Sequence, residues 1–175
     1  MTPESPELEI RIIGDPVLRK RAADVTQFGP ALEELADQMY ETMVDAVGIG
    51  LAAPQIGLSL RFLVVGIPDE DSEALKLMAF ANPRIVESEG VCLMEEGCLS
   101  IPEIREEVER PERIRLQWQD LAGTPQDAWF EDIEARVIQH ELDHLEGVLF
   151  VDRISPARKA TLKRRLALIQ QRGRL

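Results

Sequence analysis

Apolar residues recur at helical spacing in the first third of the chain. Between residues 30 and 47 they are separated by three or four positions, which places them on one face of an α-helix. These residues are Leu32, Leu35, Met39, Met43 and Val47. Pro30 suits the first turn of a helix and Gly48 suits the position after its end, so the pattern predicts an amphipathic helix over 30–47.

The middle of the chain has the composition and period of β-strands. An apolar run, RFLVVGI, and shorter apolar segments are bounded by polar or turn residues. Strands are predicted at 61–67, 79–86, 89–94 and 108–120. The last of these alternates, with apolar side chains at Ile114, Leu116 and Trp118. No helix-length segment separates these strands, so we expect antiparallel or mixed sheets.

Helical spacing returns from about Asp132. Its apolar face is traced by Ala135, Ile138, Leu142 and Leu145. Gly147 follows as a stop signal, and Ser155 and Pro156 then form the N-cap and first position of a last helix.

The order of these elements predicts an α+β fold in which a central helix packs against sheets. No internal repeat, low-complexity tract or Pro/Gly/Ser-rich linker divides the chain. At 175 residues the chain can bury a core without disulfides, so we expect residues 1–175 to form one domain.

Charge is distributed unevenly along the chain. Residues 156–175 contain seven Lys or Arg and no acid, which leaves 13 basic and 32 acidic residues in 1–155. The body therefore carries −19 and the tail +7, and any contact with nucleic acid should go through the tail alone. A solvated helix face that balances the charge of the body explains the tail equally well.

The sequence shows no sign of export or membrane insertion. MTPESPELEI lacks a basic start followed by an apolar run, and its acids argue against a transit peptide. Residues 46–60 are uncharged but too short to span a bilayer, and Pro54 and Gln55 interrupt them. We therefore expect a soluble, cytoplasmic protein with no membrane partner. Only Cys92 and Cys98 are present, so a disulfide framework is not expected.

The only two histidines of the chain form an H-E-x-x-H motif. On a helix His140 and His144 are one turn apart and can share a metal ion, while Glu141 can face a metal-bound water. The alternative is two helical histidines that merely pack or face solvent.

The third ligand of such a site should lie upstream of the motif. One zinc peptidase pattern requires a further histidine where this chain has Phe150. Another requires a glutamate on a later helix, but the only acids after His144 are Glu146 and Asp152. Cys98, in EEGCLS, is favoured as a thiolate ligand for zinc or iron(II). Cys92 lies among apolar residues and is expected to be a small core side chain.

Three segments resemble the signature motifs of the peptide deformylase family. They are GIGLAAPQIG at 48–57, EGCLS at 96–100 and QHELDHLEG at 139–147, and they occur in the family's order with similar separation. Further similarity covers nearly the whole chain, including IRIIGDPVLRKRA, RPERIRL and GVLFVDRISP. The glycines of GIGLAA also fit a loose dinucleotide-binding pattern, but a predicted helix precedes them where that pattern needs a strand.

The resemblance implies an enzyme. A metal-dependent hydrolase of this family removes the N-formyl group from the N-terminal formyl-methionine of newly synthesised proteins and releases formate. By similarity Cys98, His140 and His144 hold the metal and Glu141 is the base. The metal is expected to be iron(II), although zinc, nickel or cobalt also accept such ligands. The backbone N–H of Leu99 and the side-chain amide of Gln55 are expected to stabilise the oxyanion.

The resemblance also implies a substrate site. The glycines of the first motif should let a formylated peptide lie flat and pair with the backbone at Ile49 and Gly97. Expected pocket residues for methionine are Ile49, Met94, Ile133 and Val137. Glu96 and Arg105 are expected near the substrate, where a charge pair could orient the EGCLS strand or meet later peptide carbonyls. Asp143 is expected to brace an arginine such as Arg110. The predicted substrate-binding set is Gly48, Ile49, Gly50, Met94, Glu96, Gly97, Arg105, Ile133 and Val137.

The expected partners are formyl-methionyl nascent peptides and, through the basic helix at 158–175, the ribosome; no DNA partner is expected. Three positions depart from the commoner family pattern: Asp132 and Glu103 replace glycines, and Glu134 replaces an apolar residue. A zinc endopeptidase and a non-catalytic structural metal site are the competing hypotheses.

Overall fold

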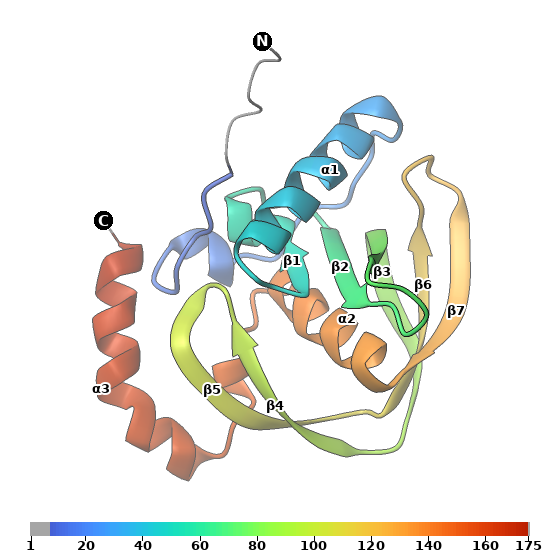
Figure 1. Ribbon diagram of the computed structural model, residues 1–175. Helices are drawn as coiled ribbons and strands as arrows, with labels where there is room; N and C mark the ends of the chain where they lie inside the picture. Colours follow the sequence, from blue (N-terminus) through green and yellow to red (C-terminus); the bar gives the residue numbers. More distant parts are fainter. Residues whose placement is uncertain (1–7, 175) are drawn as a thin grey trace.

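The computed structural model describes residues 8–174, which form two antiparallel sheets and three α-helices (Figure 1). The helices are α1 (Pro30–Asp45), α2 (Asp132–Leu145) and α3 (Pro156–Gly173), with short 3₁₀ turns η1 (Pro16–Arg19), η2 (Ala53–Ile56) and η3 (Phe150–Asp152). The strands are β1 (Gly50–Ala52), β2 (Phe62–Pro68), β3 (Leu75–Glu89), β4 (Cys92–Cys98), β5 (Ile101–Arg110), β6 (Arg113–Gln119) and β7 (Pro125–Glu131). The predicted α+β class is confirmed.

The sheets are antiparallel, as the short connections predict. One has the order β1-β2-β3-β6-β7, and β4 and β5 form a separate pair. The apolar run of β2 is buried on an interior strand of the larger sheet, between β1 and β3, with Val64 opposite Ala79 on β3. Several strand boundaries were wrong. The single strand predicted at 108–120 is divided into the end of β5 and β6, and β4 begins at Cys92 rather than at residue 89. Strand β3 is longer than the predicted 79–86, and most of β5 and all of β7 were not recognised.

Helix α2 occupies the centre of the molecule, between the two sheets (Figure 1). Ala135, Ile138 and Leu145 are fully buried and belong to one hydrophobic cluster with residues of β2, β3, β6 and β7. The helix ends before Gly147, whose φ of +73° and close approach to the Arg19 carbonyl exclude a side chain. The predicted central helix is therefore confirmed.

Helix α1 ends earlier than predicted. Leu32, Met39 and Met43 are buried as expected, but the helix stops at Asp45 rather than continuing to residue 47. Val47 was assigned to the buried face, and this was wrong, because it lies beyond the helix end with φ +58° and is 91 % exposed.

Helix α3 is capped as the sequence indicates and packs against the body. The Ser155 hydroxyl accepts a hydrogen bond from the Arg158 N–H at 3.3 Å. Leu162, Leu166 and Ile169 are buried in a cluster shared with β5 and η3. Among the described helices, none has the length and apolar content that a membrane span requires.

Candidate active site

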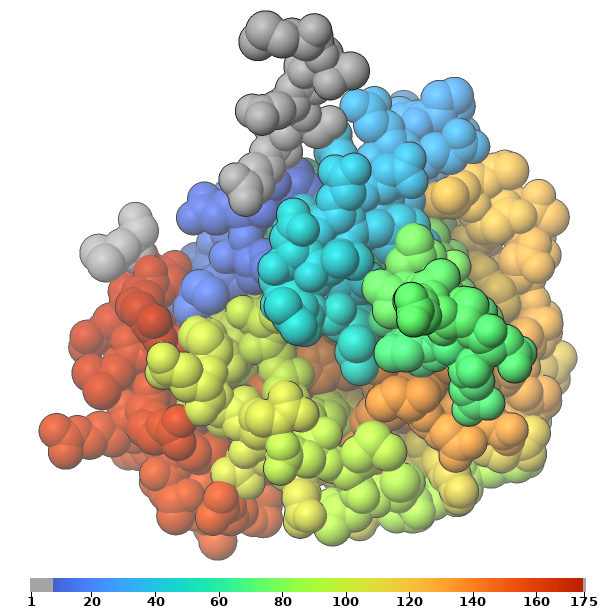
Figure 2. Space-filling model, viewed as in Figure 1, coloured from blue at the N-terminus to red at the C-terminus, as the bar shows by residue number. Residues whose placement is uncertain are grey.

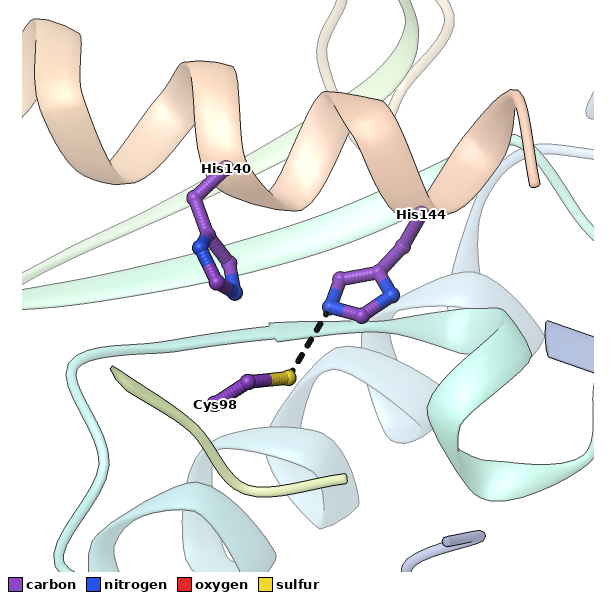
Figure 3. Close-up of side chains that lie close together, drawn as sticks. All are labelled: Cys98, His140 and His144. Carbon is purple, nitrogen blue, oxygen red and sulfur yellow. Dashed lines mark hydrogen bonds between the residues drawn. The ribbon is translucent and has the colours of Figure 1, made fainter. Parts of the chain in front are cut away.

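Cys98, His140 and His144 converge although more than forty residues separate the cysteine from the first histidine. The two histidines project from successive turns of α2, and Cys98 lies at the end of β4 beneath them (Figure 3). One potential ligand atom from each lies within 4.8 Å of the others, and Cys98 Sγ is 3.4 Å from His144 Nε2. The cluster thus combines two residues one helical turn apart on α2 with one residue at the end of β4.

The orientation of His140 is fixed by Glu96. Its Nδ1 lies 2.8 Å from Glu96 Oε1. Burial opposes ionisation of Glu96, but hydrogen bonds from Arg110 and His140 outweigh it and hold the pKa of this carboxyl well below its usual range. An ionised carboxylate can only accept, so Nδ1 carries the proton and donates it. The Nε2 lone pair of a neutral His140 is then free for a metal.

Glu96 belongs to a buried network of charges. Arg110 donates to both of its oxygens at 2.6 and 2.9 Å, and Arg136 donates to Oε2 at 2.7 Å. Arg110 also donates to Asp143 at 2.9 Å, which confirms the predicted brace. Asp143 accepts two further hydrogen bonds from Arg153, at 2.6 and 2.7 Å. Every charge in this network has a partner, as burial requires.

The pKa values of the two histidines move in opposite directions. Burial lowers the pKa of His140, but hydrogen bonds with Cys98 and Glu96 outweigh it, so the pKa lies well above its usual value. Burial and the charge of His140 hold the pKa of His144 well below its usual value, and it is a neutral ring with its Nδ1 unpartnered among the described residues.

This donor set fits a divalent metal. One sulfur and two imidazole nitrogens match the ligand classes that zinc and iron(II) accept. The surroundings of His140 raise its pKa, so they favour a positive charge at this position, which a bound cation would also supply.

Glu141 is buried beside the cluster. Its Oε2 has no hydrogen-bond partner among the described residues, and burial raises its pKa to about 7. A Cβ at Gly50 would approach Glu141 Oε1 to 2.6 Å, so the absence of a side chain on β1 leaves room for this carboxyl.

The side-chain amide nitrogen of Gln55 points toward Cys98 and Ser100. In η2 its Oε1 accepts from the Ala52 N–H at 2.9 Å, which fixes the amide orientation. Its Nε2 then lies 3.1 Å from Ser100 Oγ and 3.6 Å from Cys98 Sγ. Leu99, the other predicted oxyanion residue, directly follows Cys98 and is partly buried.

A cleft of about 570 Å³ opens from this cluster to the surface. Figure 2 shows the hollow between the end of α1, the β4–β5 pair and the start of α2. The structure brings nearly all predicted site residues into its lining: Gly48, Ile49, Gly50, Met94, Glu96, Gly97, Cys98, Leu99, Arg105, Ile133, Val137, His140 and Glu141. Gln55 and His144 lie behind this lining, each 1 % exposed.

Two sequence-based expectations about neighbouring residues were wrong. The suggested charge pair between Glu96 and Arg105 is not formed, because Glu96 faces inward and Arg105 pairs with Glu95 at 2.6 Å on the surface. Cys92 is not a core residue, because the outer end of β4 leaves it half-buried and outside the hydrophobic clusters of the described residues. Both cysteines are free thiols.

Arg136 was missed by sequence reasoning. Besides Glu96, its guanidinium donates to the Val108 carbonyl at 2.8 Å and the Cys92 carbonyl at 2.7 Å, so it joins α2 to both strands of the smaller sheet. It stands one turn before His140 on the inward face of α2 and is 5 % exposed. The sequence did contain a signal for Arg136, because it is a charged residue on the same helix face as the two histidines.

The departures from the family pattern have local explanations. Asp132 has φ +52° and Glu103 has φ +67°, conformations in which glycine is unstrained. Glu134 turns away from the core and forms an ion pair with Lys76 at 2.8 Å.

Comparisons with known proteins agree with one another. The family model for polypeptide deformylase matches residues 7–160. A peptide deformylase of Thermotoga neapolitana is 45 % identical over 166 residues, covering 94 % of this chain and 98 % of its own length. The crystal structure of peptide deformylase from Thermus thermophilus has a TM-score of 0.85 at 44 % identity, covering 94 % of this chain and 98 % of that one. A plant peptide deformylase structure has a TM-score of 0.89 at 32 % identity, covering 98 % and 94 %.

Proposed function

We propose a set of residue roles for the reaction of the polypeptide deformylase family, to which the chain belongs. The chain is a metal-dependent hydrolase that removes the N-formyl group from new proteins and releases formate. The observation that carries the proposed roles is the convergence of Cys98, His140 and His144 beside the buried Glu141 at the floor of an open cleft. We also propose that residues 1–175 act as one catalytic unit in the cytoplasm.

The three converging residues would hold one divalent ion, and we propose iron(II), with zinc, nickel or cobalt as substitutes. When bound, such an ion polarises the formyl group and lowers the pKa of a water molecule. Glu96 keeps the His140 ring oriented through Nδ1, and the burial of His144 keeps its imidazole neutral and ready to bind.

Glu141 would act as the general base and then as the general acid. Its Oε2 takes a proton from the water that attacks the formyl carbon, and returns it to the amide nitrogen as the C–N bond breaks. The buried Oε2 supports this role, because no described residue occupies it with a hydrogen bond. Gly50 supports it as well, because the absence of a side chain there leaves room for the carboxyl beside the cleft.

Gln55 Nε2 and the Leu99 N–H would donate to the oxygen that gains negative charge as water attacks. The support for Gln55 is the fixed direction of its amide, since the Ala52 N–H holds Oε1 and turns Nε2 toward Cys98. Donors fixed before the reaction require no reorganisation when the charge develops.

The peptide would bind by strand addition between two open sheet edges. Strand β1 is the terminal strand of the larger sheet, and β4 pairs only with β5. Both edges face the cleft through Gly50 and Gly97. A side chain at Gly50 would collide with Glu141, and one at Gly97 would displace the end of the Arg105 side chain. The methionine side chain would then enter the pocket that Ile49, Met94, Ile133 and Val137 line.

Formate release tests the proposed function. Purified protein is offered a formyl-methionyl peptide and its unformylated twin. We expect formate from the first and no cleavage of the second. Internal cleavage of either peptide would instead support an endopeptidase that uses the same metal helix.

The basic helix α3 supports a proposed contact with ribosomal RNA. Arg158 pairs with Glu106, Lys159 approaches Asp152, and Arg165 donates to the Glu103 carbonyl. The remaining cations of the described helix and its cap are exposed: Lys163, Arg164, Arg172 and Arg174. Exposed cations that lack acidic neighbours favour phosphate.

Truncating α3 would not test this contact cleanly, because Leu162, Leu166 and Ile169 belong to the core. Charge removal is the sharper test: K163Q, R164Q and R172Q together should weaken salt-dependent ribosome binding, while formate release from a short peptide is retained. A triple variant of exposed cations elsewhere, K20Q, R21Q and R84Q, is the matched control. Equal ribosome binding by both triple variants would contradict the contact.

A further inference from the structure

The end of helix α1 places a valine where glycine is usual. The Val47 N–H bonds to the Val44 carbonyl and the Gly48 N–H bonds to the Met43 carbonyl, both at 2.9 Å. This pair of bonds forms a Schellman motif, whose residue after the C-cap adopts a left-handed conformation and is commonly glycine. Val47 occupies that position with φ +58°. A β-branched side chain is strained there.

The fold gains no packing from this side chain. Val47 is 91 % exposed and belongs to none of the hydrophobic clusters of the described residues. It nevertheless lines the cleft, next to Gly48 and to Ile49, which is itself 42 % exposed. Val47 therefore stands at the mouth of the cleft, where only a bound molecule could cover it.

Three residues with a left-handed backbone lie at or beside this cleft. Four described residues other than glycine have a positive φ: Val47, Asn82, Glu103 and Asp132. Val47 and Glu103 line the cleft, and Asp132 directly precedes the lining residue Ile133. Backbone strain that persists at a binding site is commonly retained for function.

We propose that Val47 is a specificity-determining residue, whose isopropyl group contacts an apolar side chain among the substrate residues that follow formyl-methionine. This inference rests on the proposed function. Val47 precedes the segment proposed to pair with the peptide, so a peptide that leaves the methionine pocket along this edge passes it. Burial of the isopropyl group against an apolar partner supplies binding energy that a polar partner does not.

Steady-state kinetics with two peptides test the proposal. The substrates are formyl-Met-Leu-Leu-Lys and formyl-Met-Ser-Ser-Lys, and the variants are Val47→Gly and Val47→Asn, both of which suit a left-handed backbone. The parent should have the lower KM for the leucine peptide. Both variants should reduce that preference by about fivefold, mainly through KM, with kcat within about twofold of the parent.

Val44→Ala is the matched control. Val44 is an exposed valine in the last turn of α1, outside the cleft lining, and its replacement should leave the preference between the peptides unchanged. Relief of strain supplies a second readout, because Val47→Gly and Val47→Asn should each raise Tm by about 2–4 °C.

The outcomes distinguish a failure of the proposed function from a failure of the proposed role of Val47. If the parent releases no formate from either peptide, the proposed function is wrong and this inference falls with it. If the parent is active but both variants keep the full preference for the leucine peptide, only the role of Val47 is overturned. A fall in Tm for both variants would overturn the argument from strain.

Discussion

The floor and the rim of the cleft are built in opposite ways. At the floor, Glu96 and Arg110 are each 4 % exposed in their side chains and are bound to several partners at once. At the rim, Arg105 and Glu95 form one pair whose side chains are 64 % and 60 % exposed. The floor is held in one arrangement by many contacts, whereas the rim is held by few.

This difference separates catalysis from recognition. Reacting groups need fixed positions, since small displacements are costly in rate, and a network of buried charges supplies them. A rim that receives many protein N-termini needs contacts that tolerate different side chains. Substitutions at the floor should therefore affect turnover and metal binding strongly, and substitutions at the rim should alter KM modestly.

The largest effect is expected at the base. Glu141→Gln keeps the shape of the side chain but cannot accept a proton, so kcat should fall by about a hundredfold to ten-thousandfold while the metal content stays unchanged. Stopped formate assays together with metal analysis check this. Activity within tenfold of the parent would show that another group serves as the base.

Glu96→Gln should come next. It weakens the hold on His140 and leaves Arg110 and Arg136 without a full counter-charge in a buried site. We expect metal affinity to fall by roughly 10–100-fold and the free energy of unfolding to fall by about 3–5 kcal/mol. Metal titration and denaturant unfolding measure these effects. Glu95→Gln, one residue away on the surface, is the control and should change each by little.

At the rim, Ile133→Ala should have a smaller effect. Ile133 is 40 % exposed and lines the proposed methionine pocket. Loss of its contact with methionine should raise KM by about threefold to tenfold with little change in kcat. Leu58→Ala is the control, because Leu58 is 43 % exposed but outside the cleft lining. A large fall in kcat for Ile133→Ala would contradict this assignment, because it would mean that Ile133 supports the reacting groups at the floor of the cleft.

The smallest effect is expected for Arg105→Ala. Its exposed pair with Glu95 contributes about 0–1 kcal/mol at most, so stability should barely change. Any change in KM should stay within about threefold and should shrink as salt is added. A tenfold rise in KM that persists at high salt would mean that Arg105 binds the peptide directly and without screening.

The sequence predicted the three helices and the convergence of Cys98 with the two histidines, for physical reasons. The spacing of His140 and His144 determines their relative direction once α2 forms, and the apolar spacing of α1 and α2 is regular. Most of strand β5 was not recognised, because its inward positions include Glu106 and Arg110, which hide the alternation. Strand β7 was missed because only Phe130 among its residues is buried.

The contacts that hold the floor could not be predicted from local pattern. Arg136 is 40 residues from Glu96 and Arg110 is 14 residues from it, and only the pairing of β4 with β5 against α2 brings the three together. The conformation of Val47 was hidden for a different reason. Its apolar side chain continues the spacing of α1 past the true end of the helix.

Metal analysis of anaerobically purified protein tests the metal site most directly. The parent and Cys92→Ser should each carry about one divalent ion per chain, whereas Cys98→Ser should lose most of its ion and its formate release, because the sulfur ligand is gone. Full metal content and undiminished turnover in Cys98→Ser would contradict the proposal that this sulfur and the two imidazoles hold the metal together.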